Sequence, residues 1–593
     1  MSNLNQSTVW GQWIVDELVT AGVGTVCVTP GSRSTPLTVA CVDHPDLDVY
    51  THVDERSSAF FALGHARRTG SPVGLVCTSG TAAANFHPAV IEADTGRVPL
   101  VVLTADRPPE LRDSGANQTI DQVDLYGDAV RYHADLPVAD GTDRSLRSVR
   151  RTVAVAVAAA LDDPAGPVHL NCPFRKPLAP TPDDAPVPVA DRDAPFVRTA
   201  LGSRTPESES VDRLGQLLAD ASRPLVVAGP ADPAGVPTEA VGALSNRLDV
   251  PVFADPASGL RFGRAVEVGT VCGGYDTYAP TLEPPDIVVR LGAAPTSKRL
   301  RQWLEAVDAP QVLVDTGLEW REGTFTATDL VVGSPTATLE RVATTVSRSD
   351  GGWLETIQWA ESQHWERVSE AGRDFEGAVV ANALAEAPPG GTVTVSNSTP
   401  IRDADRFARP RSEPLSVIAN RGASGIDGVT STALGATVAG AGPGVLVTGD
   451  LAFYHDATGL AGVRRFDIDI TIVVIDNGGG GIFHMLPIAE FDPPFTEHFT
   501  TPIDVDLEEL CRPFDLPCDR TDTAGFRETY QQALEQAGPR VVVVDVDAPH
   551  SHRRRAGITD AVCSAISGTN GPPDRDGVAK GDPKTGQCDE PEE

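Results

Sequence analysis

VLVTGDL at residues 445–451 and ITIVVIDNGGGG at residues 470–481 are the two segments that decide the fold of this chain. Each begins with a short apolar run, of the length expected for a buried strand. Asp450 follows the first run and Asn477 follows the second. In a parallel sheet both strand ends lie at the carboxyl edge, where open α/β sheets bind ligands. The two segments therefore predict a parallel α/β sheet with a ligand site at that edge.

The polar residues after these runs form a set of hard oxygen donors. Asp450 offers a carboxylate, Asn477 an amide oxygen and the glycine loop that follows a backbone carbonyl. Mg²⁺ prefers such donors and keeps its other positions for water and phosphate oxygens. The glycines also let backbone N–H groups approach a diphosphate closely. This spacing resembles the metal-binding motif of thiamine-diphosphate enzymes, although Gly, Asp and Asn are equally common in ordinary turns.

Length and composition bound the class of protein. A chain of 593 residues with 41% hydrophobic residues predicts three or four domains with cores of their own. No run approaches the ~20 apolar residues that span a bilayer, and the start of the chain does not resemble a signal peptide. Nine cysteines without a CxxC pair indicate neither a disulfide framework nor a zinc site. We therefore expect a cytoplasmic enzyme.

The formal net charge of −34 is accompanied by a scarcity of lysine, which occurs only at Lys176, Lys298, Lys580 and Lys584. An acidic, lysine-poor surface is typical of halophilic proteins, because molar salt shortens the Debye length to about 3 Å and screens self-repulsion. The alternative is an acidic protein from a GC-rich genome, which also favours arginine over lysine. Nucleic acid and anionic membranes are disfavoured as partners. A basic cluster within such a chain indicates an anionic substrate.

Apolar strands and helical segments alternate along three blocks, which predicts an α/β protein with three doubly wound parallel-sheet domains. We expect domains at residues 1–185, 200–348 and 360–566, and a disordered C-terminal tail at residues 567–593. The expected strands are 23–29, 48–53, 73–78, 98–104 and 168–172; 224–228, 250–254, 286–291 and 311–314; 391–395, 415–419, 445–448, 470–475 and 540–546. Helices are expected at 57–68, 82–93 and 558–566.

Polar residues of the first block follow the ends of several expected strands. The segment 29–36 follows a strand and opens a helix, so that backbone N–H groups and Arg33 form a plausible anion site. Glu55 lies in the first turn of a helix, where the helix dipole alone favours a carboxylate. Further turns at 78–81 and 105–108, and the loop with Asn117 and Gln118, have the same relation to strand ends. We expect all of them to converge on one edge of the sheet.

These motifs together resemble the thiamine-diphosphate-dependent decarboxylase and carboligase superfamily. Within it the chain is most similar, over residues 8–566, to the menaquinone-pathway family that makes 2-succinyl-5-enolpyruvyl-6-hydroxy-3-cyclohexene-1-carboxylate, the MenD family. The matching stretches are PGSRSTPLTVA at 30–40, DERSSAFFALGHAR at 54–67, TSGTAAANFHPAVIEA at 78–93, TADRPPELRDSGANQTIDQ at 104–122, ANRGASGIDG at 419–428, GDLAFYHD at 449–456 and GGGIFHMLP at 479–487.

The resemblance implies a cofactor site. Glu55 matches the glutamate that bonds the aminopyrimidine ring of thiamine diphosphate and promotes loss of the proton from the thiazolium. Asp450, Asn477 and the carbonyl of Gly479 match the ligands of Mg²⁺ or Mn²⁺, and Ile426 matches the residue that supports the bent cofactor. The remaining cofactor contacts expected from the family are Gly449, Leu451, Gly480, Ile482, Phe483 and Leu486, the last three forming an apolar wall.

The resemblance also implies two dianionic substrates, 2-oxoglutarate and isochorismate. Ser398, Arg402 and Arg421 match the residues that hold the succinyl carboxylate. Those matching the isochorismate site are Ser32, Arg33, Arg107, Asn117, Gln118, Lys298 and Arg299. The family implies a catalytic role for Glu55, Arg33, Arg107, Gln118 and Arg402. It further implies a homodimer or homotetramer with shared active sites.

Other interpretations remain at this stage. The main enzymatic alternative is another thiamine-diphosphate 2-oxoacid decarboxylase or carboligase, such as an acetolactate synthase relative. A catalytically silent cofactor-binding or regulatory protein is the alternative from a different class. Taken singly, each arginine has a surface salt bridge of little energetic value as its alternative role. The middle block shows no clear GxGxxG motif for a nucleotide.

Overall fold

The computed structural model describes residues 5–180, 194–233, 235–348, 351–503 and 505–568. The chain forms two compact units, each described here by itself. The first unit comprises residues 1–202, 420–441 and 455–468, and the second comprises residues 203–419, 442–454 and 469–593. Ser567, expected to open the tail, instead ends the last helix, and residues 569–593 of the expected tail lie outside the described residues. The domain bounds expected from the sequence stay a prediction.

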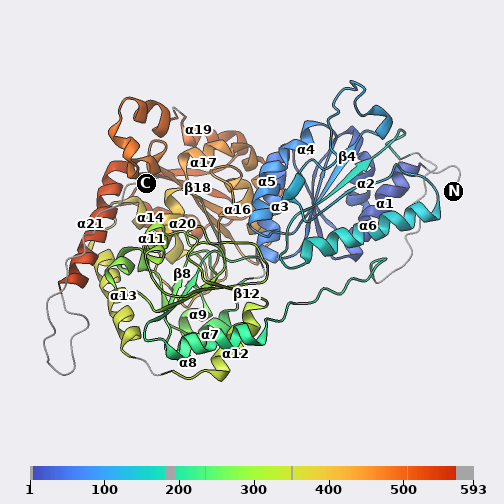
Figure 1. Ribbon diagram of the computed structural model, residues 1–593. Helices are drawn as coiled ribbons and strands as arrows, with labels where there is room; N and C mark the ends of the chain where they lie inside the picture. The colour runs from blue at the N-terminus through green and yellow to red at the C-terminus, as the bar shows by residue number, and fades with distance from the viewer. Residues whose placement is uncertain (1–4, 181–193, 234, 349–350, 504, 569–593) are drawn as a thin grey trace. The chain divides into compact units, whose positions relative to one another are not determined.

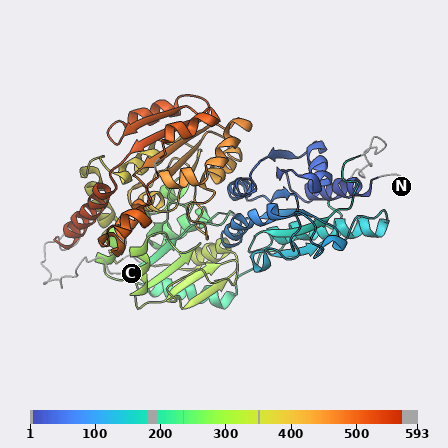
Figure 2. The ribbon, with the colours of Figure 1, turned by 90° about the horizontal axis from the view of Figure 1, so that it is seen from above.

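Three six-stranded sheets, all with parallel pairing, form the framework, which confirms the α/β fold class (Figure 1). The first has the order β2-β1-β3-β4-β6-β5, and the third has the same order, β14-β13-β15-β16-β18-β17. The second, β12-β11-β10-β7-β8-β9, is the dinucleotide-fold order 3-2-1-4-5-6 read from its other edge. Helices flank the strands of each sheet (Figure 2), as the crossovers between parallel strands require.

The first sheet belongs to the first unit. Its strands are β1 (Thr25–Thr29), β2 (Asp48–Thr51), β3 (Val73–Cys77), β4 (Leu100–Asp106), β5 (Tyr132–Asp135) and β6 (Val168–Pro173). The helices of this unit are α1 (Gln6–Thr20), α2 (Thr35–Asp43), α3 (Glu55–Thr69), α4 (Thr81–Asn85), α5 (His87–Thr95), α6 (Asp143–Leu161), α16 (Val429–Val438) and α18 (Ala461–Arg465).

The second unit contains the other two sheets. The second sheet has β7 (Pro224–Ala228), β8 (Val252–Ala254), β9 (Val271–Cys272), β10 (Ile287–Leu291), β11 (Gln311–Asp315) and β12 (Asp329–Val332), with α7 (Ser208–Asp220), α8 (Thr238–Leu248), α9 (Arg264–Val268), α10 (Tyr275–Tyr278), α11 (Lys298–Glu305) and α12 (Pro335–Thr345). The third has β13 (Thr392–Val395), β14 (Ser416–Ile418), β15 (Gly444–Gly449), β16 (Ile470–Asp476), β17 (Cys518–Asp522) and β18 (Arg540–Asp545). Around these lie α13 (Trp353–Glu370), α14 (Glu376–Glu386), α15 (Thr399–Phe407), α17 (Asp450–His455), α19 (Leu507–Cys511), α20 (Phe526–Leu534) and α21 (Ala548–Ser567).

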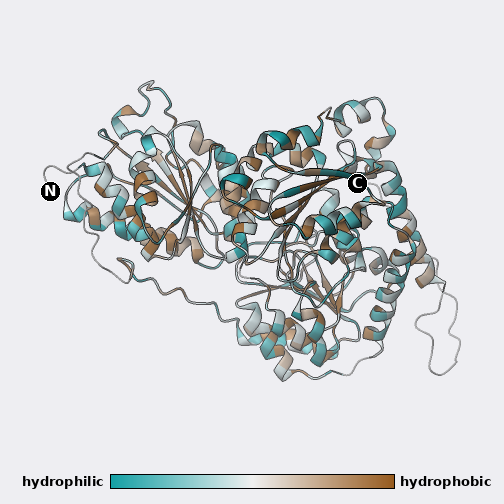
Figure 3. Ribbon diagram, turned by 180° about the vertical axis from the view of Figure 1, so that it is seen from behind, coloured by the Kyte–Doolittle hydropathy of each residue, from teal (hydrophilic) through white to brown (hydrophobic). Residues whose placement is uncertain are grey.

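The central strands are apolar on both faces because helices cover both sides of each sheet. All residues of β3, β4 and β10 are buried, and the strands form the hydrophobic interior in Figure 3. Burial of these β-branched and leucine side chains contributes roughly 1.5–3 kcal/mol each. Among the described helices, none is both long and apolar enough to cross a membrane.

One expected helix is wrong in its extent. Residues 82–93 form two helices, α4 and α5, rather than one. Pro88 explains the break, since it has no backbone N–H and its ring clashes with the preceding turn, so it fits only the first turn of a new helix. Four strands, β5, β9, β12 and β17, were not expected from the sequence, and each lies at the edge of its sheet.

In the first unit, α16 packs against α3 with backbone contact. A Cβ on Gly64 of α3 would lie 2.0 Å from the carbonyl oxygen of Thr432, and one on Gly435 of α16 would lie 1.9 Å from that of Phe61. Both positions therefore require glycine. This crossing makes residues 420–441, which follow β14 in sequence, part of the first unit.

Candidate functional site

Arg33 lies at the carboxyl edge of the first sheet, in the turn between β1 and α2. Its backbone N–H donates to Oγ1 of Thr78 at 3.3 Å, and its guanidinium donates to the carbonyl oxygen of Phe174 at 2.6 Å. Burial lowers the pKa of Arg33, the charge of Arg107 lowers it further, and Asp106 opposes both. Two guanidinium groups thus lie within electrostatic range of each other, which is costly unless an anion joins them.

Arg107, Asn117 and Gln118 lie at the same edge. Nη2 of Arg107 donates to the carbonyl oxygen of Asn117 at 2.9 Å. Nε2 of Gln118 donates to the carbonyl oxygen of Ser79, and Oγ of Ser79 donates back to the carbonyl oxygen of Gln118, both at 3.1 Å. Gln118 has a φ of 54°, a left-handed conformation that is held by these two bonds. The sequence expectation that these turns converge agrees with this arrangement; Ser32, next to Arg33, is exposed.

A buried polar network supports this edge, and the sequence reasoning missed it. Gly80 N–H donates to Oε1 of Gln122 at 2.9 Å, and Nε2 of Gln122 donates to Oδ1 of Asn171 at 3.2 Å. Nδ2 of Asn171 then donates to Oδ2 of Asp106 at 3.0 Å, directly before Arg107. Asn171 is a fully buried residue of β6, so an amide within a mostly apolar strand was the available signal.

Glu55 begins α3. The N-cap residue Asp54 accepts the backbone N–H of Arg56 at 2.9 Å, which fixes the start of the helix. Glu55 is half-buried, and its pKa lies above the usual value because burial disfavours the carboxylate; a backbone hydrogen bond opposes the shift and Asp54 adds to it. A carboxyl group tuned in this direction suits proton transfer.

Glu92 anchors the loop that carries Arg421 and Ile426 in the first unit, another feature absent from the sequence interpretation. Its fully buried carboxylate accepts the backbone N–H groups of Gly422 at 3.0 Å, Ala423 at 2.6 Å and Ser424 at 2.9 Å. Arg67 forms an ion pair with the same carboxylate at 3.3 Å. Carboxylate bonds to backbone N–H groups are charge-assisted and strong. The loop is therefore fixed at its base, while Ile426 is 37% exposed.

In the second unit, Asp450 and Asn477 follow the adjacent strands β15 and β16, in which Gly449 pairs with Ile475. Asp450 is 3% exposed, and Oδ1 accepts the backbone N–H of Leu451 at 2.8 Å. Burial, with a smaller contribution from nearby Asp476, raises the pKa of Asp450 to about 7. Oδ1 of Asn477 is buried and accepts no hydrogen bond from any residue that the structure describes.

The loop after Asn477 completes this donor set. Gly479 has a φ of 122°, and a Cβ there would lie 2.1 Å from the carbonyl oxygen of Thr500, so only glycine fits. The carbonyl oxygen of Gly479 accepts Gly481 N–H at 2.8 Å and retains a second lone pair. A buried carboxylate of raised pKa, an amide oxygen without a partner and this carbonyl are donors that a divalent cation would satisfy. The residues therefore fit the metal implied by the family.

A cavity of about 210 Å³ in the second unit contains five of the expected site residues. Lys298 and Arg299 come from the first turn of α11, and Arg402 comes from α15. Nη1 of Arg402 donates to the carbonyl oxygen of Ser398 at 2.6 Å, and Ser398 has a φ of 72°, a conformation rare outside glycine. The full lining is Asp276, Thr296, Ser297, Lys298, Arg299, Arg301, Gln302, Arg402, Asp405, Arg406, Ile482, Met485 and Leu486.

The cavity is an anion site with an apolar side. It has five cationic side chains and two acidic ones, in a chain of net charge −34. Both acids are already paired, Asp276 with Arg406 at 2.6 Å and Asp405 with Arg261 at 2.9 Å. Ile482, Met485 and Leu486 form the apolar side. Phe483 was also expected in this wall, but its ring packs edge-on against that of Phe499, with 5.5 Å between the ring centroids. Arg301, Gln302 and Arg406 were not expected from the sequence.

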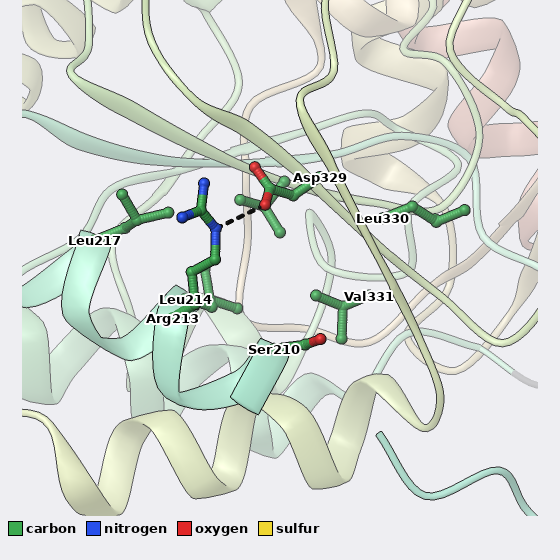
Figure 4. Close-up of a pocket in the computed structure, with 8 residues that line it drawn as sticks. Ser210, Arg213, Leu214, Leu217, Asp329, Leu330 and Val331 are labelled. Carbon is green, nitrogen blue, oxygen red and sulfur yellow. Dashed lines mark hydrogen bonds and ion pairs between the residues drawn. The ribbon is translucent and has the colours of Figure 1, made fainter. Parts of the chain in front are cut away.

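A second cavity, of about 70 Å³, lies between α7 and β12 (Figure 4). Arg213 and Asp329, which line it, form an ion pair at 2.8 Å (Figure 4). It contains none of the expected site residues, and its volume is about a third of that of the cation-lined cavity. An open hollow of about 540 Å³ beside Asn477 has Asp476, Asp545 and Asp547 as its charged residues, which does not suit an anion. The cation-lined cavity is therefore the candidate substrate site of this unit.

Comparison with known proteins identifies the family of the chain. Residues 9–125 match the N-terminal TPP-binding domain of thiamine pyrophosphate enzymes, and residues 399–545 match their C-terminal TPP-binding domain. The 2-succinyl-5-enolpyruvyl-6-hydroxy-3-cyclohexene-1-carboxylate synthase of Halobacterium salinarum is 51% identical, covering 95% of this chain and 99% of the relative. That of Natronomonas pharaonis is 50% identical over 95% and 100%, and that of a Roseiflexus species 41% identical over 93% and 97%. The chain belongs to the family of thiamine-diphosphate-dependent 2-succinyl-5-enolpyruvyl-6-hydroxy-3-cyclohexene-1-carboxylate synthases of menaquinone biosynthesis.

Proposed function

We propose that this protein decarboxylates 2-oxoglutarate and adds the resulting succinyl-semialdehyde carbanion to isochorismate. The C1–C2 bond of 2-oxoglutarate breaks, CO₂ leaves, and the carbon that keeps the electron pair forms a bond to isochorismate. The observation that carries the proposal is the cavity in which Lys298, Arg299 and Arg402 converge beside an apolar side. Two dianions need several fixed cations, because an unpaired carboxylate is expensive to remove from water.

In this proposal, different cationic side chains bind the two substrates. Arg402 and Ser398, together with Arg421, bind the distal carboxylate of 2-oxoglutarate in this proposal. Isochorismate is bound by Arg33, Arg107, Lys298 and Arg299, with Ser32, Asn117 and Gln118 as hydrogen-bonding partners. The left-handed backbone of Gln118 and Ser398 supports these assignments, since strained conformations cluster at functional sites.

The cofactor residues have separate tasks. Asp450, Asn477 and the Gly479 carbonyl would hold Mg²⁺ or Mn²⁺, and through it the diphosphate. When bound, thiamine diphosphate supplies the electron sink for the pair left by CO₂. Glu55 holds and transfers a proton at the aminopyrimidine ring, for which its raised pKa is suited. Ile426 would support the cofactor, Gly449, Leu451 and Gly480 would line its diphosphate, and the apolar side chains of Ile482 and Leu486 would lower the polarity around it.

We further propose a homodimer, or a tetramer built from such dimers, in which one subunit supplies Glu55 and its partner supplies Asp450. The support for this proposal is the family resemblance, which implies that the two groups come from different subunits. A two-fold arrangement would then generate two equivalent sites per dimer. A cytoplasmic location, without nucleic acid or a membrane as partner, is part of the same proposal.

One assay tests the reaction. The protein is incubated with thiamine diphosphate, Mg²⁺, 2-oxoglutarate and isochorismate, and CO₂ and the adduct are measured by mass spectrometry. Both should appear in equal amounts, and omission of either the cofactor or the metal should abolish both. Turnover with pyruvate in place of 2-oxoglutarate would instead support an acetolactate-synthase-like reaction, which the comparisons do not favour. Absence of any turnover would support a silent cofactor-binding protein.

Halophilic behaviour is a separate proposal, supported by the charge of −34 and by the relatives from Halobacterium and Natronomonas. At low ionic strength the excess carboxylates repel one another, since the Debye length grows from about 3 Å at 1 M to about 30 Å at 0.01 M. Activity and Tm should fall steeply as KCl is removed. Full activity and an unchanged Tm in dilute buffer would contradict it and leave the acidic surface as a genomic bias.

A further inference from the structure

We propose that Asp276 is a positioning residue for both substrates, because it fixes the two helices whose cations line the cavity. The inference rests on the proposed function, which assigns Lys298 and Arg299 on α11 to isochorismate and Arg402 on α15 to 2-oxoglutarate. Asp276 itself lies on α10, beside the second sheet, and only 2% of it is exposed. It gives the second sheet a role in the reaction that its strand order alone does not indicate.

The first contact of Asp276 fixes the start of α11. Oδ1 accepts the hydroxyl hydrogen of Ser297 at 2.5 Å, while Oγ of Ser297 accepts the backbone N–H of Leu300 at 2.9 Å. Ser297 is the N-cap residue, so its orientation determines where α11 begins. Nε of Arg299 also donates to the backbone carbonyl oxygen of Asp276 at 3.0 Å. Lys298 and Arg299 are therefore presented from a helix end that is bonded directly to Asp276.

The second contact fixes α15. Oδ2 of Asp276 accepts Nε of Arg406 at 2.6 Å. Arg406 lies one turn after Arg402, and residues four apart share a helix face. One carboxylate thus bonds the end of α11 with one oxygen and the face of α15 with the other. The separation between the two groups of cations depends on that bridge.

Charge makes this bridge sensitive to substitution. Burial raises the pKa of Asp276, but Arg406, the Ser297 hydroxyl and Arg299 outweigh burial, so the pKa lies below its usual value and the group is ionised. Removing one partner of a buried ion pair leaves the other charge uncompensated. Without Asp276 the Arg406 guanidinium would turn toward the cavity, where it would compete with Arg402 for the substrate carboxylate.

The fold should survive the loss of Asp276 because a second ion pair holds α15. Arg261 is fully buried and forms an ion pair with Asp405 at 2.9 Å. It also donates to the carbonyl oxygens of Ala404 at 3.0 Å and Asp405 at 2.7 Å, at the end of α15. Loss of Asp276 should therefore displace the cations of α11 relative to those of α15, while α15 stays in place.

The test uses the full-length enzyme loaded with thiamine diphosphate and Mg²⁺ in concentrated KCl. Asp276→Asn should raise KM for both substrates by about tenfold to a hundredfold, since a displacement near 1 Å can cost about a hundredfold. Ser297→Ala should raise KM mainly for isochorismate, and Arg406→Gln should raise it mainly for 2-oxoglutarate. In each case KM should rise more than kcat falls. Asp276→Glu, which keeps the charge, should restore part of the loss.

The matched control is Glu322→Gln, which changes a carboxylate in the loop between β11 and β12 that is 2% exposed and ion-paired with Arg290 at 3.4 Å, outside the cavity. It should lower Tm without raising KM for either substrate. KM values of Asp276→Asn that lie within twofold of those of Glu322→Gln for both substrates would overturn the proposal. If Asp276→Asn does not fold, equal effects of Ser297→Ala and Arg406→Gln on both substrates would overturn it instead. If the wild-type enzyme does not use these substrates, the proposed function is refuted. This outcome is distinct because it does not depend on any substitution.

Discussion

The first and third sheets have the same strand order but carry different chemistry at their carboxyl edges. In each, the first and third strands of the block lie side by side, β1 with β3 and β13 with β15, and this is the topological switch point where ligands bind. Arg33 follows β1, and Ser398 and Arg402 follow β13. The turn Ser79-Gly80 follows β3, whereas Asp450 follows β15. Equivalent places in the two sheets are thus occupied by unrelated functional groups.

The difference extends to how each edge is supported. At the first edge, a network of buried amides and a carboxylate (Gln122, Asn171, Asp106) reaches the site from inside the sheet. At the third, the strands β15 and β16 are buried up to their last residues, and the proposed oxygen donors come from the residues that follow. Strand order therefore determines where a site forms, and the residues after each strand determine what it binds.

The largest expected effect separates these two edges by cofactor binding. Glu55→Gln should lower kcat by about 10²–10⁴-fold, the usual value of acid–base catalysis, while leaving Mg²⁺-dependent binding of thiamine diphosphate intact. Asp450→Asn should abolish turnover and also weaken that binding, because a neutral amide replaces the only charged donor of the metal site. Calorimetry with the cofactor, with and without Mg²⁺, distinguishes the two. If Glu55→Gln lost cofactor binding while Asp450→Asn kept it, the roles predicted for the two edges would be wrong.

The next effect concerns the arginines at equivalent positions. Arg402→Ala should weaken binding of 2-oxoglutarate and Arg33→Ala that of isochorismate, each by about 2–5 kcal/mol, the cost of leaving a buried charge without its partner. Steady-state kinetics with each substrate varied in turn measures both as a rise in KM. Arg213→Ala is the control, since its exposed pair with Asp329 is worth only about 0–1 kcal/mol. Equal effects of Arg402→Ala and Arg33→Ala on the two substrates would refute the division of cations.

A smaller effect is expected at the loop held by Glu92. In Glu92→Gln, the amide can accept fewer of the three N–H groups that the carboxylate accepts. Each donor left unpaired costs about 1–3 kcal/mol, so we expect a lower Tm and roughly tenfold lower activity. Hydrogen exchange at residues 420–428 should accelerate. Glu110→Gln, which removes an exposed pair with Arg175, should change none of these, and unchanged exchange in Glu92→Gln would show that the loop needs no such anchor.

The sequence predicted the buried strands well and the edge strands poorly, for one physical reason. A central strand is covered on both faces, so it is an apolar run that can be recognised from the residues alone. The sequence reasoning missed β5 and β17, which contain YHAD and CDRTD; β5 is only partly buried and β17 is largely exposed. An edge strand is specified by its single neighbour, and no pattern within the strand records that neighbour.

The residues of the candidate site were likewise only partly predictable from the sequence. The residues proposed to bind a ligand lie in the turns or helices that follow strands, and Lys298 and Arg402 were expected from the family resemblance. Glu92 and Asp276 could not, because their partners are backbone groups or side chains distant in sequence, such as Gly422 for Glu92 and Arg406 for Asp276. Each occurs in a helix where a solvated carboxylate is ordinary. Only the fold reveals that these two carboxylates are buried.

The last prediction tests whether the two edges act together across subunits. Glu55→Gln and Asp450→Ala variants should each have almost no activity, and their subunits are allowed to exchange. If one subunit supplies Glu55 and its partner Asp450, a mixed dimer has one site with both substitutions and one with neither. Random exchange makes half of the dimers mixed, so about a quarter of wild-type activity should return. If each chain builds its own site, every site in the mixture keeps one substitution and the mixture stays inactive. A wild-type and Glu55→Gln mixture controls for dilution, because its activity should follow the wild-type fraction in both cases.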